Sequence, residues 1–145
     1  MNRYISEQLR ALVTKRAAGI CEYCLINIED TYFGAEIDHI ISIKHGGQSI
    51  IENLALACQT CNRNKGSDVG SIAFSTKRFF RFFNPRKDKW SKHFRLNGAV
   101  IEPLTKIGEV TVKIFGFNEN DRLLERNGLI EIKHYPSPTA QKRMK

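Results

Sequence analysis

The sequence carries two pairs of cysteines with two residues between the members of each pair. They are CEYC at 21–24 and CQTC at 58–61. Four sulfur ligands around one ion favour a structural zinc site, because a catalytic zinc normally keeps one position open for water. We therefore expect one Zn²⁺ ion to be bound by Cys21, Cys24, Cys58 and Cys61. Buried or redox-active thiols are the alternative.

A second set of residues, between and after these pairs, is suited to phosphodiester hydrolysis. Asp38 and His39 are adjacent, and Asn53 and Asn62 follow in the same region. A neutral imidazole can accept a proton from water near physiological pH, so His39 is the expected general base. Asp38 and Asn62 offer hard oxygen ligands for one catalytic divalent metal, for which Mg²⁺ is the best candidate. Asn53 would hold the loop and the His39 ring in place.

Together, EIDHIISIKHGG and ENLALACQTCNRNKG resemble the HNH endonuclease motif, with offsets similar to those in the HNH domain of RNA-guided CRISPR nucleases. The cysteine pairs resemble those of zinc-braced HNH proteins, and FNPRKDKWSKHF is similar to a downstream segment of small stand-alone bacterial members. The resemblance implies a ββα-metal (His-Me finger) core and cleavage of DNA. Asn62 stands where the motif's last His would be, which removes a nitrogen ligand and bears on the metal preferred.

Three further residues could assist, and each has an ordinary structural alternative. Glu36 would share a strand face with Asp38 and could be a further ligand, or it is a solvated carboxylate. His45 and Lys65 could contact phosphates, or they are an exposed turn histidine and a solvent-facing helix charge. Asn53 itself could be only a turn or cap residue.

The positive charge is concentrated in one part of the chain. The net charge is +8, yet residues 1–62 sum to −2 and residues 63–95 to +8. A local basic surface suits a polyanion, because binding phosphates releases counterions; a solvated basic face is the alternative. Within KRFFRFFNPRKDKWSKHFR we expect most aromatic rings in the core and nucleic-acid-binding roles for Arg78, Arg81, Arg86 and Lys87.

The elements that must position these residues are predicted to form one α+β domain, 1–145. A helix should run from Ser6 to about Ala18. Strands are expected at TYFG, EIDHII and IENLALAC, with a helix from Thr60. The HNH core with its zinc site would span 6–70.

The remainder, 71–135, should be a mixed extension packed on that core, followed by a flexible tail at 136–145. Ile72 to Phe83 has roughly helical spacing, and Gly98 to Ile101 is strand-like. The alternation at 110–114 predicts a half-buried strand, and Glu119 to Arg126 should be helical.

These features favour a cytoplasmic enzyme that acts on nucleic acid. No apolar run approaches the roughly 20 residues that cross a bilayer, so we expect no membrane contact. The main hypothesis is a metal-dependent endonuclease acting on double-stranded DNA. A homodimer would be the simple route to cutting both strands, and membership of a larger effector complex is a second possible assembly. The alternatives are a catalytically inactive zinc-braced nucleic-acid-binding module and a zinc-dependent protein interaction domain.

Overall fold

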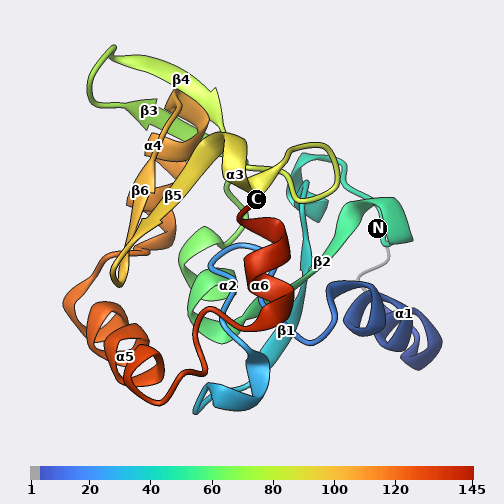
Figure 1. Cartoon of the computed structure of the whole chain (residues 1–145). Helices are drawn as coiled ribbons and strands as arrows, with labels where there is room; N and C mark the ends of the chain where they lie inside the picture. The colour runs from blue at the N-terminus through green and yellow to red at the C-terminus, as the bar shows by residue number, and fades with distance from the viewer. Residues whose placement is uncertain (1–3) are drawn as a thin grey trace.

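Residues 4–145, which a computed structural model describes, contain three two-stranded antiparallel sheets and several helices (Figure 1). The first sheet pairs β1 (Ala35–His39) with β2 (Leu54–Cys58), and α2 (Gln59–Lys65) follows β2 directly. Asp38 lies opposite Ala55, and His39 lies opposite Leu54. The strand IENLALAC is confirmed only from Leu54 onward, because the residues before it form a 3₁₀ turn, Ile51–Asn53. The predicted helix after the second cysteine pair is confirmed.

Strand β2 is buried on both faces, which its sequence LALAC allows because every side chain is apolar or a thiol. On one face, Leu54 and Leu56 pack with α1 (Glu7–Ala17) in a small core. On the other face, Ala55 and Ala57 pack in the main core with the cysteines. The N-terminal helix is confirmed: the Ser6 side chain accepts a hydrogen bond from Leu9 N, and Ala18 ends the helix in the left-handed region.

The predicted strand at TYFG is wrong, since residues 31–34 form a turn and β1 pairs with β2 instead. The Thr31 hydroxyl donates to Ile28 O and accepts from Gly34 N, which closes the turn. Gly34 has φ +78°, a conformation that favours glycine. Side-chain hydrogen bonding by Thr31 therefore competes successfully with strand pairing.

The next two sheets are hairpins. One pairs β3 (Gly70–Ala73) with β4 (Arg78–Arg81), and the other pairs β5 (Phe94–Asn97) with β6 (Val100–Pro103). The β3–β4 hairpin projects from the body of the molecule at the upper left of Figure 1. The helix expected from Ile72 to Phe83 is wrong because these residues pair across a hairpin, and Lys77 takes φ +62° in its turn. The strand expected at Gly98 to Ile101 is confirmed from Val100 onward.

Three more helices complete this half: α3 (Trp90–His93), α4 (Lys106–Phe115) and α5 (Asn120–Glu131). The strand predicted at 110–114 is wrong, since these residues lie inside α4. The Thr105 hydroxyl caps α4 by accepting from Gly108 N, and Gly116 ends it at φ +65°. The helix predicted at Glu119 to Arg126 is confirmed but continues past Gly128.

The C-terminal segment was expected to be a flexible tail at 136–145, but it contains α6 (Pro138–Arg143). The Ser137 hydroxyl caps this helix by accepting from Ala140 N, and proline occupies its first turn, where a missing N–H costs nothing. Ala140 is buried, and the Arg143 guanidinium reaches the Glu22 carboxylate at 3.3 Å. The segment that looked disordered therefore contains a capped helix that packs against the rest of the protein.

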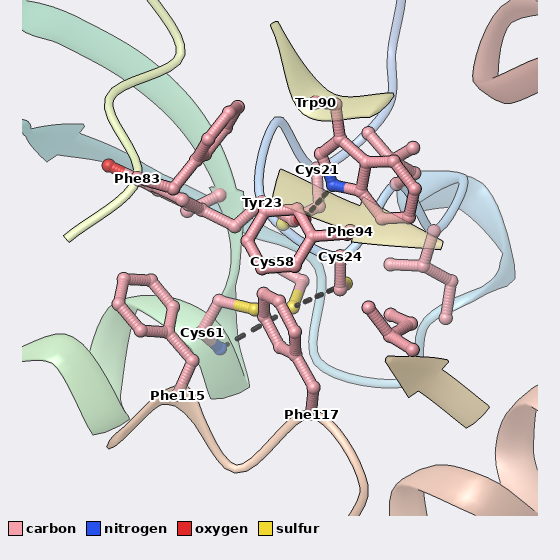
Figure 2. Packing of buried hydrophobic residues seen from close by; sticks show 14 of the residues in the cluster. Cys21, Tyr23, Cys24, Cys58, Cys61, Phe83, Trp90, Phe94, Phe115 and Phe117 are labelled. Carbon is pink, nitrogen blue, oxygen red and sulfur yellow. Dashed lines mark hydrogen bonds between the residues drawn. The ribbon is translucent and has the colours of Figure 1, made fainter. Parts of the chain in front are cut away.

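The main core surrounds the four cysteines and is rich in aromatic rings (Figure 2). As expected, most rings of the basic–aromatic segment lie inside it, namely Phe82, Phe83, Trp90 and Phe94. The mixed α+β class predicted from the sequence is confirmed. Within residues 4–145, no helix combines the length and apolar character needed to span a membrane.

Candidate functional site

The four cysteines form a buried cluster whose geometry suits a tetrahedral ion. Their sulfur atoms all lie within 4.8 Å of one another, and Sγ of Cys24 is 3.8 Å from Sγ of Cys58. Four sulfurs at Zn–S bonds of about 2.3 Å would be about 3.8 Å apart along each tetrahedral edge. The donors therefore fit Zn²⁺, and their burial among Tyr23 and several phenylalanines leaves no open side for a substrate (Figure 2).

Two local structures hold the cysteines in place. Cys21 and Cys24 lie in a tight turn in which Cys21 N donates to Ile26 O and Leu25 N donates to Cys21 O. Cys58 ends β2 and caps α2, where its sulfur accepts a hydrogen bond from Cys61 N at 3.4 Å. The sheet and the helix therefore carry one pair, and the turn carries the other.

A buried arginine from the far end of the chain completes the cluster. Nη2 of Arg122, on α5, lies 3.1 Å from Sγ of Cys61 and 3.7 Å from Sγ of Cys58, while Nη1 donates to Phe115 O. Burial lowers the pKa of Arg122, but the neighbouring sulfur atoms outweigh it and raise that pKa overall. Burial raises the pKa of Cys21 and Cys61 well above their ordinary values, whereas hydrogen bonds from the other cysteines lower the pKa of Cys24 well below its ordinary value. Arg122 therefore places a positive charge directly beside the sulfur atoms, where it can stabilise a thiolate, the form that binds metal.

Beside the cluster, a pocket of about 300 Å³ is lined by three of the four predicted catalytic residues, whereas Asn53 lies outside its wall. Asp38 and His39 reach it from the end of β1, and Asn62 reaches it from α2. The loop after β1 and the end of α2 supply the rest of the wall: Ile37, Ser42, Ile43, Lys44, Gly66 and Ser67. Residues that the spacing of the motif singled out are therefore neighbours in space.

Asp38 is buried and has a partner on each carboxylate oxygen. The Tyr23 hydroxyl donates to Oδ2 at 2.5 Å, and the Lys65 ammonium lies 3.1 Å from Oδ1. Burial raises the pKa of Asp38, and the positive charge of Lys65 and the hydrogen bond from Tyr23 oppose that rise. Lys65 also donates to His39 O at 2.9 Å, so it ties α2 to the end of β1.

The donor set of the pocket also suits a hard divalent cation. Asp38 and Asn62 both line this pocket, and their side-chain oxygens are of the kind that Mg²⁺ prefers. A carboxylate has about four lone-pair positions, so the bonds from Tyr23 and Lys65 leave Asp38 able to accept further contacts. Two protein ligands leave positions for water and phosphate oxygens.

His39 and Asn53 are both hydrogen-bonded around the loop that follows β1. Nε2 of His39 lies 2.8 Å from the Ser49 hydroxyl. The Asn53 carboxamide accepts from Ile41 N and donates to Ile41 O and Gln48 O, all within 3.0 Å. Asn53 thus fixes the two ends of the loop whose middle lines the pocket. Gly47 is needed in that loop, because a Cβ there would lie 1.7 Å from Ile41 O.

Two other candidates lie outside the pocket wall. Glu36 is exposed and borders a different hollow of about 460 Å³, between α1 and β1, although it shares a strand face with Asp38. His45 is exposed at the end of a 3₁₀ turn, Ile43–His45, just beyond the residues that line the pocket. Neither side chain is brought to the catalytic cluster.

The predicted nucleic-acid-binding arginines and lysine divide into two groups. Arg78 and Lys87 are exposed. Arg81 is held by a bidentate pair with Asp88, at 2.6 and 3.0 Å, and Arg86 is ion-paired with the fully buried Glu22. The second group is therefore engaged in ion pairs within the fold, whereas the first presents unpaired charge on the surface.

Sequence reasoning missed several residues that matter to both centres. Tyr23 and Ser49 contact Asp38 and His39 in the pocket, Glu22 contacts the backbone of β2, and Arg122 contacts the cysteines. One signal was available for the first pair of cysteines: CEYC places a Glu and a Tyr between two expected ligands, where their side chains must be buried. No local signal marks Arg122, which is 61 residues from its partner Cys61.

The turn CEYC physically joins the two centres. Cys21 and Cys24 belong to the cluster, while the Tyr23 hydroxyl bonds Asp38 in the pocket. Glu22 accepts from Leu56 N at 2.9 Å and so holds the turn against β2. A single four-residue segment therefore positions two of the sulfur atoms and the Asp38 carboxylate together.

Comparison with known proteins identifies this region. The family model described as HNH endonuclease matches residues 21–68. The match spans both cysteine pairs and the pocket residues Asp38, His39, Asn53 and Asn62, and it confirms the resemblance found in the sequence. Curated proteins and solved structures gave no match. Residues 21–68 are therefore an HNH domain.

Proposed function

We propose that this HNH protein is a metal-dependent endonuclease that hydrolyses phosphodiester bonds in DNA, with β1, β2 and α2 as a ββα-metal core. One observation carries the proposal: Asp38, His39 and Asn62, the residues of the family motif, line a single open pocket. Hydrolysis needs an activated water and neutralisation of charge on the phosphoryl and leaving oxygens. The pocket offers groups for both.

His39 would act as the general base. Its imidazole is oriented by the hydrogen bond between Nε2 and the Ser49 hydroxyl and is half-buried at the pocket wall. A neutral imidazole accepts a proton from water near physiological pH, and such a base contributes roughly 10²–10⁴-fold to the rate. The attacking water would lie within hydrogen-bond reach of this ring.

Asp38 and Asn62 would hold one divalent cation, most suitably Mg²⁺. When bound, such an ion neutralises charge on the phosphate and stabilises the leaving oxygen. Tyr23 and Lys65 fix the direction of the Asp38 carboxylate before any ion arrives. Fixed ligands lose little freedom on binding, which favours a defined geometry around the phosphate.

Asn53 would support the base indirectly. Its three hydrogen bonds hold the loop between Ile41 and Gln48, which carries pocket residues Ser42 to Lys44 and leads into Ser49. Losing them would release both the wall of the pocket and the partner of His39. Structural Zn²⁺ on the four cysteines would fix the turn CEYC against α2, and so fix Asp38 relative to Asn62.

Double-stranded DNA is the proposed partner, held mainly through phosphates. Arg78 and Lys87 are exposed cations in the basic part of the chain, and Lys44 and His45 flank the pocket. Phosphate contacts make binding salt-dependent and nearly independent of sequence. Arg81 and Arg86, both ion-paired, would contribute chiefly by keeping that surface in shape.

A plasmid-nicking assay tests the proposal. We expect nicking by the zinc-loaded protein with Mg²⁺, and a loss of roughly 10²–10⁴-fold in His39→Ala, with zinc content and circular dichroism unchanged. His134→Ala is the matched control, because His134 is an exposed histidine paired with Asp30 away from the pocket. Equal nicking by wild type and His39→Ala would exclude His39 as the base. Salt-sensitive binding with no nicking under any divalent metal would identify a binding module without turnover.

A further inference from the structure

The β3–β4 hairpin carries an apolar surface that the proposed chemistry does not use. Residues alternate across it: Ala73 and Phe80 face the core, whereas Ile72 and Phe79, paired across the strands, face outward. Ile72 is 47% exposed and Phe79 is 58% exposed, and Phe74 at the turn is 75% exposed. We call Ile72, Phe74 and Phe79 the hairpin face. Exposed aromatic rings grouped in this way mark interaction sites more often than isolated ones do.

The ring of Phe79 is held against the backbone of the neighbouring strand. A Cβ added at Gly70 would lie 2.5 Å from Cζ of Phe79 and 2.4 Å from Phe80 O, so only glycine allows this approach. The ring therefore covers Gly70 with one side and presents its other side outward. Such a ring is already ordered, and it loses little conformational freedom when a flat partner stacks on it.

The turn of the hairpin is also anchored. The Ser75 hydroxyl donates to the Glu109 carboxylate at 2.8 Å, and the Lys106 ammonium donates to the same hydroxyl at 2.7 Å, which ties the turn to α4. Lys77 Nζ lies 4.1 Å above the centre of the Phe74 ring, a cation–π arrangement. The hairpin face thus belongs to a hairpin whose turn is fixed to α4.

The hairpin begins at the edge of the pocket. Ser67 lines the pocket and β3 starts at Gly70, so the two are at most about 10 Å apart along the chain. Ile72 is within about 18 Å of Ser67 by the same limit, and its partner Phe79 lies about 5 Å further across the strands. Because bases rise about 3.4 Å per step in a duplex, the hairpin face can reach bases within roughly five to seven steps of a phosphate in the pocket.

Charge favours a polyanion over an apolar protein partner on this surface. Residues 69–87 contain five Lys or Arg and no Asp or Glu, and of these Arg81 and Arg86 are ion-paired with Asp88 and Glu22. Lys77, at the turn beside Phe74, and Arg78 are exposed, although Arg78 pairs with Ala73 and so lies on the opposite side of the hairpin from Phe79. Aromatic rings among cations that meet phosphates are the usual platform for unpaired nucleotides, because every base offers a flat face to stack on.

We propose that the hairpin face stacks on unpaired bases next to the scissile phosphate, so that the substrate class is DNA with a single-stranded or locally unpaired segment beside duplex. This inference rests on the proposed nuclease function and narrows it. Phe79 is the main stacking ring, Phe74 extends the platform, and Lys77, which lies over the Phe74 ring, contacts the backbone phosphates. Fully paired DNA offers no base face to these rings and binds through phosphates alone.

Binding measurements on the full-length, zinc-loaded protein test the inference. Fluorescence anisotropy would compare two labelled DNA probes of the same sequence, a duplex and that duplex with five unpaired nucleotides, without added divalent metal or chelator. Wild type should bind the unpaired probe at least 10-fold more tightly. Phe79→Ala should lose roughly 5- to 150-fold on that probe and little on the duplex, while Phe79→Tyr retains the preference.

Phe33→Ala is the matched control, because Phe33 is a similarly exposed phenylalanine in the turn before β1, and it should leave both affinities unchanged. Equal affinity of wild type for the two probes, or equal losses in Phe79→Ala and Phe33→Ala, would overturn the inference. So would a dimer in solution that Phe79→Ala converts to monomer, since the face would then bind a second copy. If the protein nicks DNA but binds the two probes equally, this inference alone is refuted. If it binds the unpaired probe more tightly but does not nick, only the proposed function is refuted.

Discussion

The cysteine cluster and the pocket beside it share residues 21–68, but they differ in how far each is open to solvent. The cluster supplies four ligands from its own chain and is closed on every side by core residues. The pocket, in the proposed function, supplies only two oxygen ligands and leaves space for water and phosphate. A closed centre stabilises the fold, whereas an open one can exchange its contents. Damage to the two should therefore have different consequences.

The largest effect should come from breaking the closed centre. Cys61→Ser removes one of four ligands, and structural zinc contributes about 10–16 kcal/mol of apparent binding free energy in small zinc domains, as much as the whole stability of an ordinary domain. We expect the variant to lose its zinc and its cooperative unfolding transition, measured by elemental analysis and thermal circular dichroism.

The neighbouring residue provides the control for that experiment. Asn62→Ala changes the open centre one position away on the same helix, and it should keep one zinc per chain and a normal unfolding transition while losing nicking. A folded Cys61→Ser protein that still holds one zinc would contradict the distinction. An unfolded Asn62→Ala protein would contradict it equally.

The second largest effect concerns an ion pair beside the open centre that should stabilise the fold. Lys65 and Asp38 form an ion pair in which the side chains are only 2% and 4% exposed. Lys65→Met leaves the carboxylate buried without its cation, which typically costs about 3–5 kcal/mol. Urea unfolding would measure the loss in free energy. Added Mg²⁺ should restore more stability to this variant than to wild type, because a divalent ion at Asp38 supplies the missing charge.

Arg63→Met is the matched control for this measurement. Arg63 lies on the same helix but is exposed, so its removal should change the free energy of unfolding by no more than about 0.5 kcal/mol. If both variants lose the same stability, the buried pair does not contribute to the fold as the structure indicates, and the pocket is as dispensable as an exposed surface.

The residues that the sequence identified are those whose spacing is itself the signal. The cysteine pairs and the set Asp38, His39 and Asn62 lie at offsets that chemistry requires, and the structure brings the cysteines into one cluster and the other three to one pocket. Their partners could not be found in this way: Lys65 was expected to contact phosphates or to face solvent, whereas it is buried and paired with Asp38. Tyr23, Lys65 and Arg122 reach their contacts across 15, 27 and 61 residues, and only the folded chain brings them there.

Errors in the second half of the fold have a different origin. The segment 110–114 alternates apolar and polar residues as a strand would. The mostly apolar side chains at positions 107, 110, 111, 114 and 115, however, also recur at the spacing of one helix face. The capping hydroxyl of Thr105 and the glycine at 116 decide between the two patterns in favour of α4. For residues 72–83, the decisive feature is the turn at Lys77, which takes the left-handed conformation. This turn could not be predicted from the sequence, because residues other than glycine rarely adopt that conformation.

The smallest effect concerns the link between the two centres. Tyr23→Phe keeps the ring in the core but removes the hydroxyl that donates to Asp38 Oδ2 at 2.5 Å. A hydrogen bond to a charged acceptor contributes about 1.5–3 kcal/mol, so urea unfolding should show a loss in that range with zinc content unchanged. Nicking should also fall, because Asp38 loses one of the two contacts that fix its direction.

The matched control is Tyr135→Phe. The Tyr135 hydroxyl donates to the uncharged Cys24 carbonyl at 2.8 Å, and its removal should lower the free energy of unfolding by about 0.5–1.5 kcal/mol. Equal losses of stability in the two variants, with nicking unaffected by Tyr23→Phe, would show that the closed and open centres act independently, despite the four-residue turn that they share.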